Sequence, residues 1–105
     1  MEENEYHQKA DPKMHELLEF CEELEEQYDV EAELEEGVLN LKMPDGRQYV
    51  INKHTPSRQI WVSSPYSGAG YFEWNGANWA PKRAAAAQGK DLSSFIKEEV
   101  KKHLD

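Results

Sequence analysis

Four glutamates in the first third of the chain have a spacing that could bind a cation. Glu19, Glu22, Glu23 and Glu26 lie three or four residues apart, so a helix would carry them on one face. Like charges at this spacing destabilise a helix, which makes their accumulation notable. Carboxylate oxygens suit hard cations such as ferric iron, Mg²⁺, Ca²⁺ and Mn²⁺. More carboxylates follow at Asp29, Glu31, Glu33, Glu35 and Glu36.

A metal site in this segment would be exposed, shallow and weak. The chain has no pair of Glu-x-x-His motifs for a buried di-iron bundle, and no cluster of Cys and His for zinc. His7 and His15 could each add a nitrogen ligand, although histidines at such positions are more often ordinary surface residues. On charge alone, a solvated helix face without a ligand is the more frequent explanation of the glutamates.

The charge is unevenly distributed along the chain. Residues 1–36 hold 15 of the 21 acidic residues and only two of the 12 basic residues, a net charge of −13. This anionic end disfavours binding to nucleic acid through its phosphates and favours cations or a basic protein partner. No apolar run approaches the roughly 18 residues of a membrane span, so we expect no membrane partner.

A second candidate surface lies around Trp61. If Ile60 and Val62 point into the core, the two-residue period of a strand turns Trp61 outward. A Trp among polar side chains on an exposed sheet is typical of a protein-binding surface. The sequence equally allows Trp61 to lie flat on its neighbours and cover the sheet. We assign no catalytic residue, because Cys21 falls in an apolar stripe and no nucleophile motif is present.

Two helices and a set of short strands would position these residues. Apolar residues at three- and four-residue spacing predict a first helix over about residues 6–28, and Pro12 either fits a first turn beginning near Asp11 or kinks a longer helix. Its predicted buried stripe is Ala10, Met14, Leu17, Leu18, Cys21, Leu24 and Tyr28. Asp91 can cap a last helix, whose predicted stripe is Leu92, Phe95, Ile96, Val100 and Leu104.

Between the helices the apolar residues alternate with polar ones. The alternating runs are bounded by turn sequences such as Pro44-Asp45-Gly46 and Asn75-Gly76, and the pattern is lost over residues 81–90. We therefore predict an α+β two-layer sandwich: an antiparallel sheet of five or six strands with the N- and C-terminal helices packed on one face. A chain of 105 residues suffices for one such unit, so residues 1–105 are predicted to be a single domain.

The stretch from Tyr49 to Pro65 resembles the signature of the frataxin family, in its mitochondrial members and their bacterial relatives. The segment Gly37-Val38-Leu39 and the aromatic pair Phe72 and Trp74 also fit. The resemblance implies the fold predicted above and weak binding of Fe²⁺ and Fe³⁺. It further implies that the open sheet face docks on the complex of cysteine desulfurase and iron–sulfur scaffold protein and regulates cluster assembly.

The resemblance also assigns residues. The metal-binding role falls on what we call the acidic ridge, Asp11, Glu19, Glu22, Glu23, Glu26, Asp29 and Glu31. The partner-binding role falls on Asn52, Ser57, Gln59 and Trp61. The chain departs from the family pattern at His54, where Gln is usual, and at Gly70 and Tyr71, where a basic residue is common. Residues 81–90 also form a longer segment than the usual turn.

Several alternatives stay open at this point. The chain could instead be a ferroxidase or iron chaperone, which oxidises and delivers iron, or a purely acidic interaction module without a metal role. Whether it is an enzyme is therefore undecided. We expect a monomer, with iron-dependent oligomers as the alternative. The expected location is the mitochondrial matrix for a eukaryotic mature form, and the cytoplasm for a bacterial one.

Overall fold

A computed structural model describes residues 1–105 and contains two helices and six strands. The chain runs through α1 (Glu3–Glu25), β1 (Glu31–Glu35), β2 (Val38–Lys42), β3 (Gln48–His54), β4 (Gln59–Ser64), β5 (Gly68–Trp74), β6 (Trp79–Arg83) and α2 (Leu92–Leu104). Single 3₁₀ turns, η1 (Thr55–Ser57) and η2 (Ala85–Ala87), precede β4 and α2. This order matches the predicted arrangement of helix, strands and helix.

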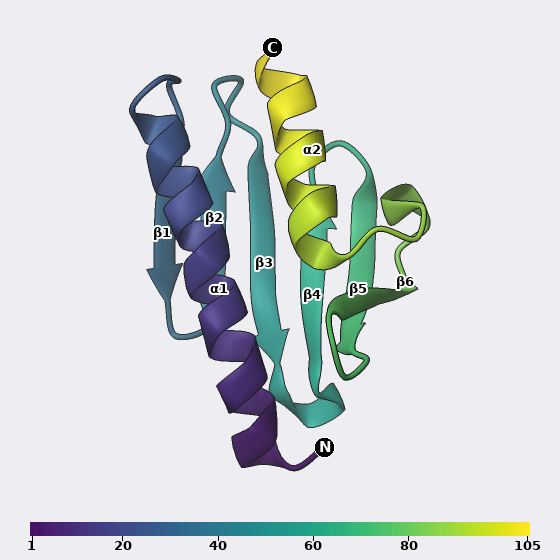
Figure 1. Ribbon diagram of the computed structural model, residues 1–105. Coiled ribbons are helices and arrows are strands. Elements are labelled where there is room, and N and C mark those ends of the chain that lie inside the picture. The colour runs from purple at the N-terminus through teal and green to yellow at the C-terminus, as the bar shows by residue number, and fades with distance from the viewer.

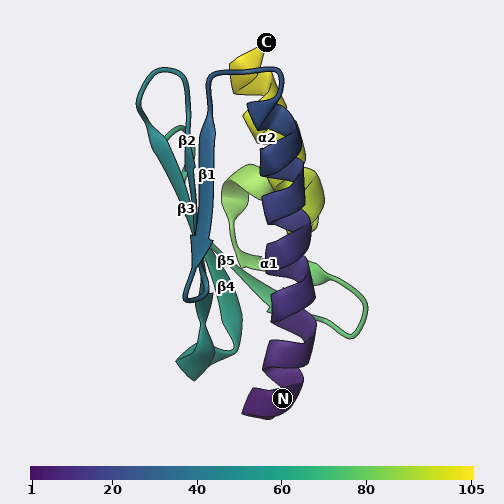
Figure 2. The same ribbon diagram turned by 90° about the vertical axis from the view of Figure 1, so that its left-hand side faces the viewer.

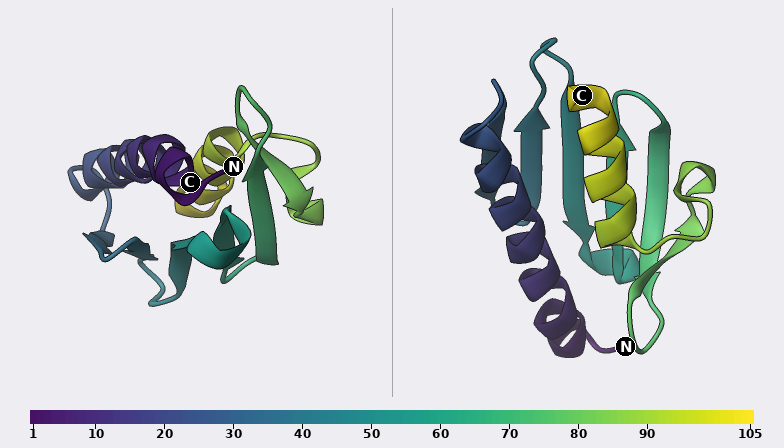
Figure 3. Two further views of the ribbon diagram at one scale, coloured as in Figure 1. Left: turned by 90° about the horizontal axis from the view of Figure 1, so that it is seen from below. Right: turned by 45° about the horizontal axis from the view of Figure 1, so that its top comes forward.

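The six strands form one antiparallel sheet in the order β1-β2-β3-β4-β5-β6, so every strand pairs with its neighbour in sequence. Both helices lie against the same face of this sheet (Figures 1 and 2). They run side by side across it, and no element covers the opposite face (Figure 3). The predicted two-layer sandwich is therefore confirmed, with six strands. Neither helix is both long and apolar enough to cross a bilayer.

The core lies between the helices and the covered sheet face. Leu39, Ile51, Ile60 and Phe72 are each at most 1% exposed and come from the four central strands. They meet the apolar stripes of α1 and α2, so the alternation in the strands selects the face that the helices cover. Asp91 caps α2 as predicted, because its side chain accepts a hydrogen bond from the backbone N–H of Ser94 at 2.9 Å.

The first helix differs from the prediction at both ends. It begins at Glu3 and ends at Glu25, so Pro12 lies inside it rather than in a first turn. The predicted stripe missed Tyr6 and Phe20, which are buried. Tyr28, its last predicted member, packs against the core but lies beyond the end of the helix. Tyr6 anchors the early turns, because its hydroxyl donates to the carbonyl oxygen of Gln59 at 2.6 Å.

The segment over residues 81–90 has a packing role that its sequence did not reveal. Pro81, Lys82 and Arg83 complete the edge strand β6, where a proline is tolerated because one side of the strand has no partner. The pairing with β5 slips between Tyr71 and Phe72, and Ala84 then lies over Gly70. A Cβ atom at position 70 would lie 2.9 Å from the Cβ of Ala84, so this site requires glycine.

Gly70→Ala should therefore destabilise the protein by about 1–3 kcal/mol, since the added methyl group overpacks a closed contact. Ala84→Gly in the same chain should recover part of that loss by removing the opposing methyl group. Chemical denaturation of both single variants and the double variant measures the coupling. Ala69→Ser, at the exposed neighbouring position, is the control. Strictly additive effects would show that residues 70 and 84 do not contact each other.

Candidate functional site

The four helix glutamates of the acidic ridge are exposed and unpaired. Glu19, Glu22 and Glu23 lie on α1, and Glu26 is the residue that caps its C-terminal end. All four are exposed, and none of them forms an ion pair or a side-chain hydrogen bond. Their charges are therefore compensated only by water and salt. A cation that bound there would displace solvent and no protein group.

Two other carboxylates of α1 already have partners from distant parts of the chain. Asp11, the first residue of the acidic ridge, pairs with the ammonium group of Lys53 on β3. Eight residues of helix separate Asp11 from Glu19, which corresponds to about 12 Å along the axis. The structure therefore does not bring Asp11 together with the four helix glutamates, and a metal ion would have to displace Lys53 to bind it.

Glu16 is the second paired carboxylate, and it joins the two helices. It accepts hydrogen bonds from Lys13 at 2.9 Å and from the buried Ser93 hydroxyl of α2 at 2.6 Å, and Lys97 lies 3.4 Å away. Partial burial alone would raise the pKa of Glu16, but the hydrogen bonds from Ser93 and Lys13 and the charges of Lys13 and Lys97 outweigh it and lower that pKa. Glu16 is thus a structural residue rather than part of a free anionic surface.

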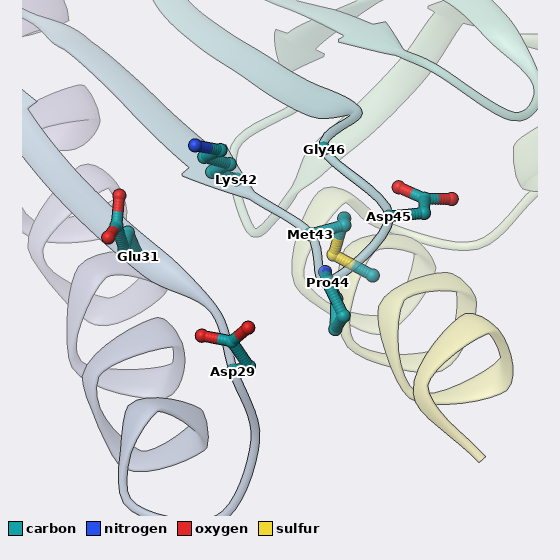
Figure 4. A pocket seen from close by; sticks show the side chains of 7 residues that line it. All are labelled: Asp29, Glu31, Lys42, Met43, Pro44, Asp45 and Gly46. Atoms are coloured by element: carbon teal, nitrogen blue, oxygen red, sulfur yellow. The ribbon is translucent and has the colours of Figure 1, made fainter.

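The remaining residues of the acidic ridge, Asp29 and Glu31, line a shallow pocket of about 370 Å³ at the end of the sheet. The turn between β2 and β3 forms its other wall, with Asp45 and Gly46, and Lys42 lies between Glu31 and that turn (Figure 4). Asp45 is engaged, because it accepts hydrogen bonds from the backbone of Arg47 and from the Tyr66 hydroxyl. Asp29 and Glu31 are the two free carboxylates of this pocket.

The glutamates of β1 point away from the helices. Glu31, Glu33 and Glu35 are exposed and alternate with Ala32 and Leu34, which pack against the core. Anionic charge therefore continues from α1 around the edge of the sheet to its open face. Nowhere in the structure do three His, Cys, Asp or Glu side chains gather closely enough to form a ready metal cage. Any ion bound here would keep much of its water.

Aromatic and polar side chains gather at the centre of the open sheet face. The rings of Trp61 and His54 stack face to face, with centroids 3.7 Å apart and an angle of 10° between planes. On the adjacent strand β5, the ring of Tyr71 lies 4.9 Å from Trp61. The Trp61 indole N–H donates to Gln59 Oε1 at 2.8 Å, and so does the Ser57 hydroxyl at 2.9 Å. We call His54, Ser57, Gln59, Trp61 and Tyr71 the Trp61 cluster.

The predicted partner-binding residues therefore lie together. Gln59, Trp61 and Ser57 are in the Trp61 cluster, and Asn52 is directly opposite Trp61 in the register of β3 with β4. Trp61 faces outward as predicted, but it is half-buried by its neighbours rather than freely exposed. The prediction of binding residues missed His54 and also Glu73, which accepts a hydrogen bond from Gln59 at 2.8 Å. Continuing the alternation from Asn52 by two residues would have placed His54 on this face.

Cys21 has no role in either surface. It is fully buried in the stripe of α1, and burial together with the nearby charges of Glu25 and Glu22 raises the pKa of its thiol to about 12. The thiol therefore stays protonated at neutral pH and is a poor nucleophile and metal ligand. This agrees with its interpretation as a core residue.

Comparison with known proteins decides the family. The sequence model described as "Frataxin-like domain" matches residues 1–105, the whole of the chain described here. The chain belongs to the frataxin family. Its antiparallel six-stranded sheet, with both helices on one face, matches the fold of solved frataxins. One solved relative is trimeric frataxin from the yeast Saccharomyces cerevisiae in complex with ferrous iron. The two structures align with a TM-score of 0.77 and 34% sequence identity, over 99% of this chain and 87% of the yeast chain.

Relatives come from both mitochondria and bacteria. The mitochondrial frataxin homolog of Saccharomyces cerevisiae is 38% identical over 94% of this chain, and the mitochondrial frataxin of Arabidopsis thaliana is 36% identical over 95%. The chain spans only 56% and 54% of their lengths. The iron-sulfur cluster assembly protein CyaY of Vibrio cholerae is 30% identical over the whole chain and 94% of its own length. Frataxin from Psychromonas ingrahamii shares the fold, with a TM-score of 0.80 at 22% identity.

Neutralising part of the acidic ridge should stabilise the protein. Glu22→Gln combined with Glu26→Gln removes repulsion and no partner, so at low salt the melting temperature should rise by about 1–3 °C. The gain should shrink at high salt, because exposed charges are screened. Glu16→Gln is the matched control and should lower the melting temperature, since that carboxylate has three partners. A lower melting temperature for the double variant would reveal stabilising contacts of these glutamates.

Proposed function

We propose that this chain is an iron-binding regulator of iron–sulfur cluster assembly. In this proposal the open sheet face docks on the complex of cysteine desulfurase and scaffold protein, and the acidic ridge binds Fe²⁺ or Fe³⁺ weakly. The observation that carries the proposal is that two free surfaces coexist in a frataxin-family chain: carboxylates without protein partners, and an uncovered sheet face with an ordered aromatic cluster. Membership of a family that includes an iron-sulfur cluster assembly protein supports it.

The donor set supports iron as the ligand of the acidic ridge. Carboxylate oxygens are hard ligands, and Glu19, Glu22, Glu23, Glu26, Asp29 and Glu31 form no ion pair that a metal ion would have to displace. The structure of the yeast relative in complex with ferrous iron also supports iron as the ligand. Binding should be weak and fast, because no three ligands are gathered in advance. Asp11 contributes least in this proposal, since Lys53 occupies its carboxylate.

The Trp61 cluster supports docking through the open face. Trp, Tyr and polar side chains that are ordered before binding lose little conformational entropy on association, which favours such residues as anchors. Gln59 Oε1 accepts hydrogen bonds from the Trp61 indole N–H and from the Ser57 hydroxyl. Asn52 lies opposite Trp61 in the register of β3 with β4. We propose that residues 1–105 act as one unit in this role. A monomer is the proposed state, although the yeast relative was solved as a trimer. The proposed location of the protein is the mitochondrial matrix if it is eukaryotic and the cytoplasm if it is bacterial, because its relatives include both mitochondrial frataxins and bacterial CyaY.

Iron should bind at the free carboxylates and not at the paired ones. Under anaerobic conditions, Fe²⁺ or Mn²⁺ should broaden amide NMR signals mainly over residues 19–31, with less effect around Asp11. Affinity should fall as salt rises, because exposed sites are screened. Glu19→Gln with Glu23→Gln should weaken binding, whereas Glu98→Gln, an exposed carboxylate of α2 paired with Lys90, should not. Broadening centred on α2 would contradict the proposed site.

Stability and docking should respond in opposite order to two adjacent substitutions. Ile60→Ala should cost about 2–5 kcal/mol of unfolding free energy, because it empties a fully buried position. Trp61→Ala should cost less, about 1–2 kcal/mol, since it removes ring contacts at the surface and leaves no cavity. For binding to the desulfurase–scaffold complex, Trp61→Ala should be the worse variant, with a loss of about thirtyfold. Chemical denaturation and a binding titration measure both, and parent-like binding of Trp61→Ala would refute the proposed docking surface.

A further inference from the structure

Trp61 is held by neighbours on three sides. Its strand β4 lies between β3 and β5, so His54 covers the indole from one flank and Tyr71 from the other. The indole N–H is fixed along the strand by Gln59. These neighbours leave Trp61 half-buried. Of the two ring contacts, the one with His54 is the closer and the more nearly parallel, at 3.7 Å and 10° against 4.9 Å and 33° for Tyr71.

The orientation of His54 is itself fixed by hydrogen bonds. Its Nδ1 lies 2.6 Å from the Ser57 hydroxyl oxygen, and that hydroxyl donates to Gln59 Oε1 at 2.9 Å. The Ser57 hydroxyl thus links the imidazole of His54 to the side-chain amide of Gln59. A chain of hydrogen bonds therefore runs from His54 through Ser57 and Gln59, and the indole of Trp61 closes it.

We propose that His54 is the positioning residue of the docking face, because its ring stacks on the Trp61 indole and holds it in the orientation that the partner meets. This inference rests on the proposed docking function and goes beyond it by assigning a role to a residue outside the predicted binding set. Without the imidazole, one flank of Trp61 would be open. The indole could then lean toward β3, and binding would carry the cost of ordering it again.

The test uses the full chain and separates ring contact from hydrogen bonding. His54→Gln can still donate to Ser57 but offers no ring, whereas His54→Phe keeps a ring and loses the hydrogen bond. His103→Gln is the matched control. His103, on α2, makes an equally close stack on Tyr66 in the β4–β5 loop, with ring centroids 3.7 Å apart and 8° between planes. The two measurements are the heteronuclear NOE of the Trp61 indole N–H, which reports fast ring motion, and the Kd for the desulfurase–scaffold complex.

His54→Gln should lower the indole NOE and raise the Kd about threefold to tenfold, the value of one aromatic contact, while changing the melting temperature by only a few degrees. His54→Phe and His103→Gln should both match the parent in the NOE and in the Kd. A result in which His54→Phe loses as much binding as His54→Gln would overturn the proposal, since a ring at position 54 would then not suffice to position Trp61.

Trp61→Ala separates failure of this inference from failure of the proposed function. If Trp61→Ala weakens binding but His54→Gln leaves both the NOE and the Kd unchanged, the role of His54 is refuted and docking through the sheet stands. If Trp61→Ala binds as tightly as the parent, the docking surface is wrong and the role of His54 in docking is refuted with it. The NOE of His54→Gln then still decides whether the histidine orders the indole.

Discussion

Burial of only one face of a six-stranded sheet is the constraint from which the positions of the functional residues follow. Ile60 and Val62 are under the helices and at most 2% exposed, so the period of the strand sends Gln59 and Trp61 to the other side. No second layer covers these side chains, and they contact one another instead. The result is an aromatic cluster across three strands, in which His54 stacks on Trp61 and Tyr71 makes a tilted contact with it. The indole is thus ordered on the open face by its stack on His54 and its hydrogen bond to Gln59.

The carboxylates divide into two classes with different physical roles. Asp11 and Glu16 meet Lys53, Lys13, Ser93 and Lys97, and these contacts join α1 to the sheet and to α2. The four helix glutamates have no such partner and add repulsion along one helix face. Sequence spacing cannot distinguish the classes, since both kinds of residue are acidic positions outside the apolar stripe of the first helix. The distinction depends on cations that are 42 and 81 residues away in the chain.

Periodicity predicted the fold and the orientation of the open face well. A strand with one buried face has an apolar side chain at every second residue, and a helix with one buried face has them three or four residues apart. Periodicity failed where a contact between distant residues decided the outcome. The first helix begins earlier than its apolar stripe suggested, since Tyr6 is anchored by Gln59 on β4 and by an edge contact with Trp79. Likewise, the requirement for Gly70 depends on Ala84, which a slip in the pairing of β5 and β6 brings over it. His54 could have been found from alternation, but its stack on Trp61 depends on the register of β3 with β4.

The two candidate surfaces meet at the edge of the sheet, yet their direct electrostatic coupling is small. Glu31, Glu33 and Glu35 share the open face with Trp61, but β1 and β4 are three strand spacings apart, about 14 Å. The Debye length at physiological salt is about 8 Å, so an ion bound at the β1 glutamates is largely screened from the indole. The strands between them pair in a regular antiparallel register. Iron at β1 could therefore influence docking at Trp61 only if one partner covered both β1 and β4. In that case the partner, and not the sheet, couples the two surfaces.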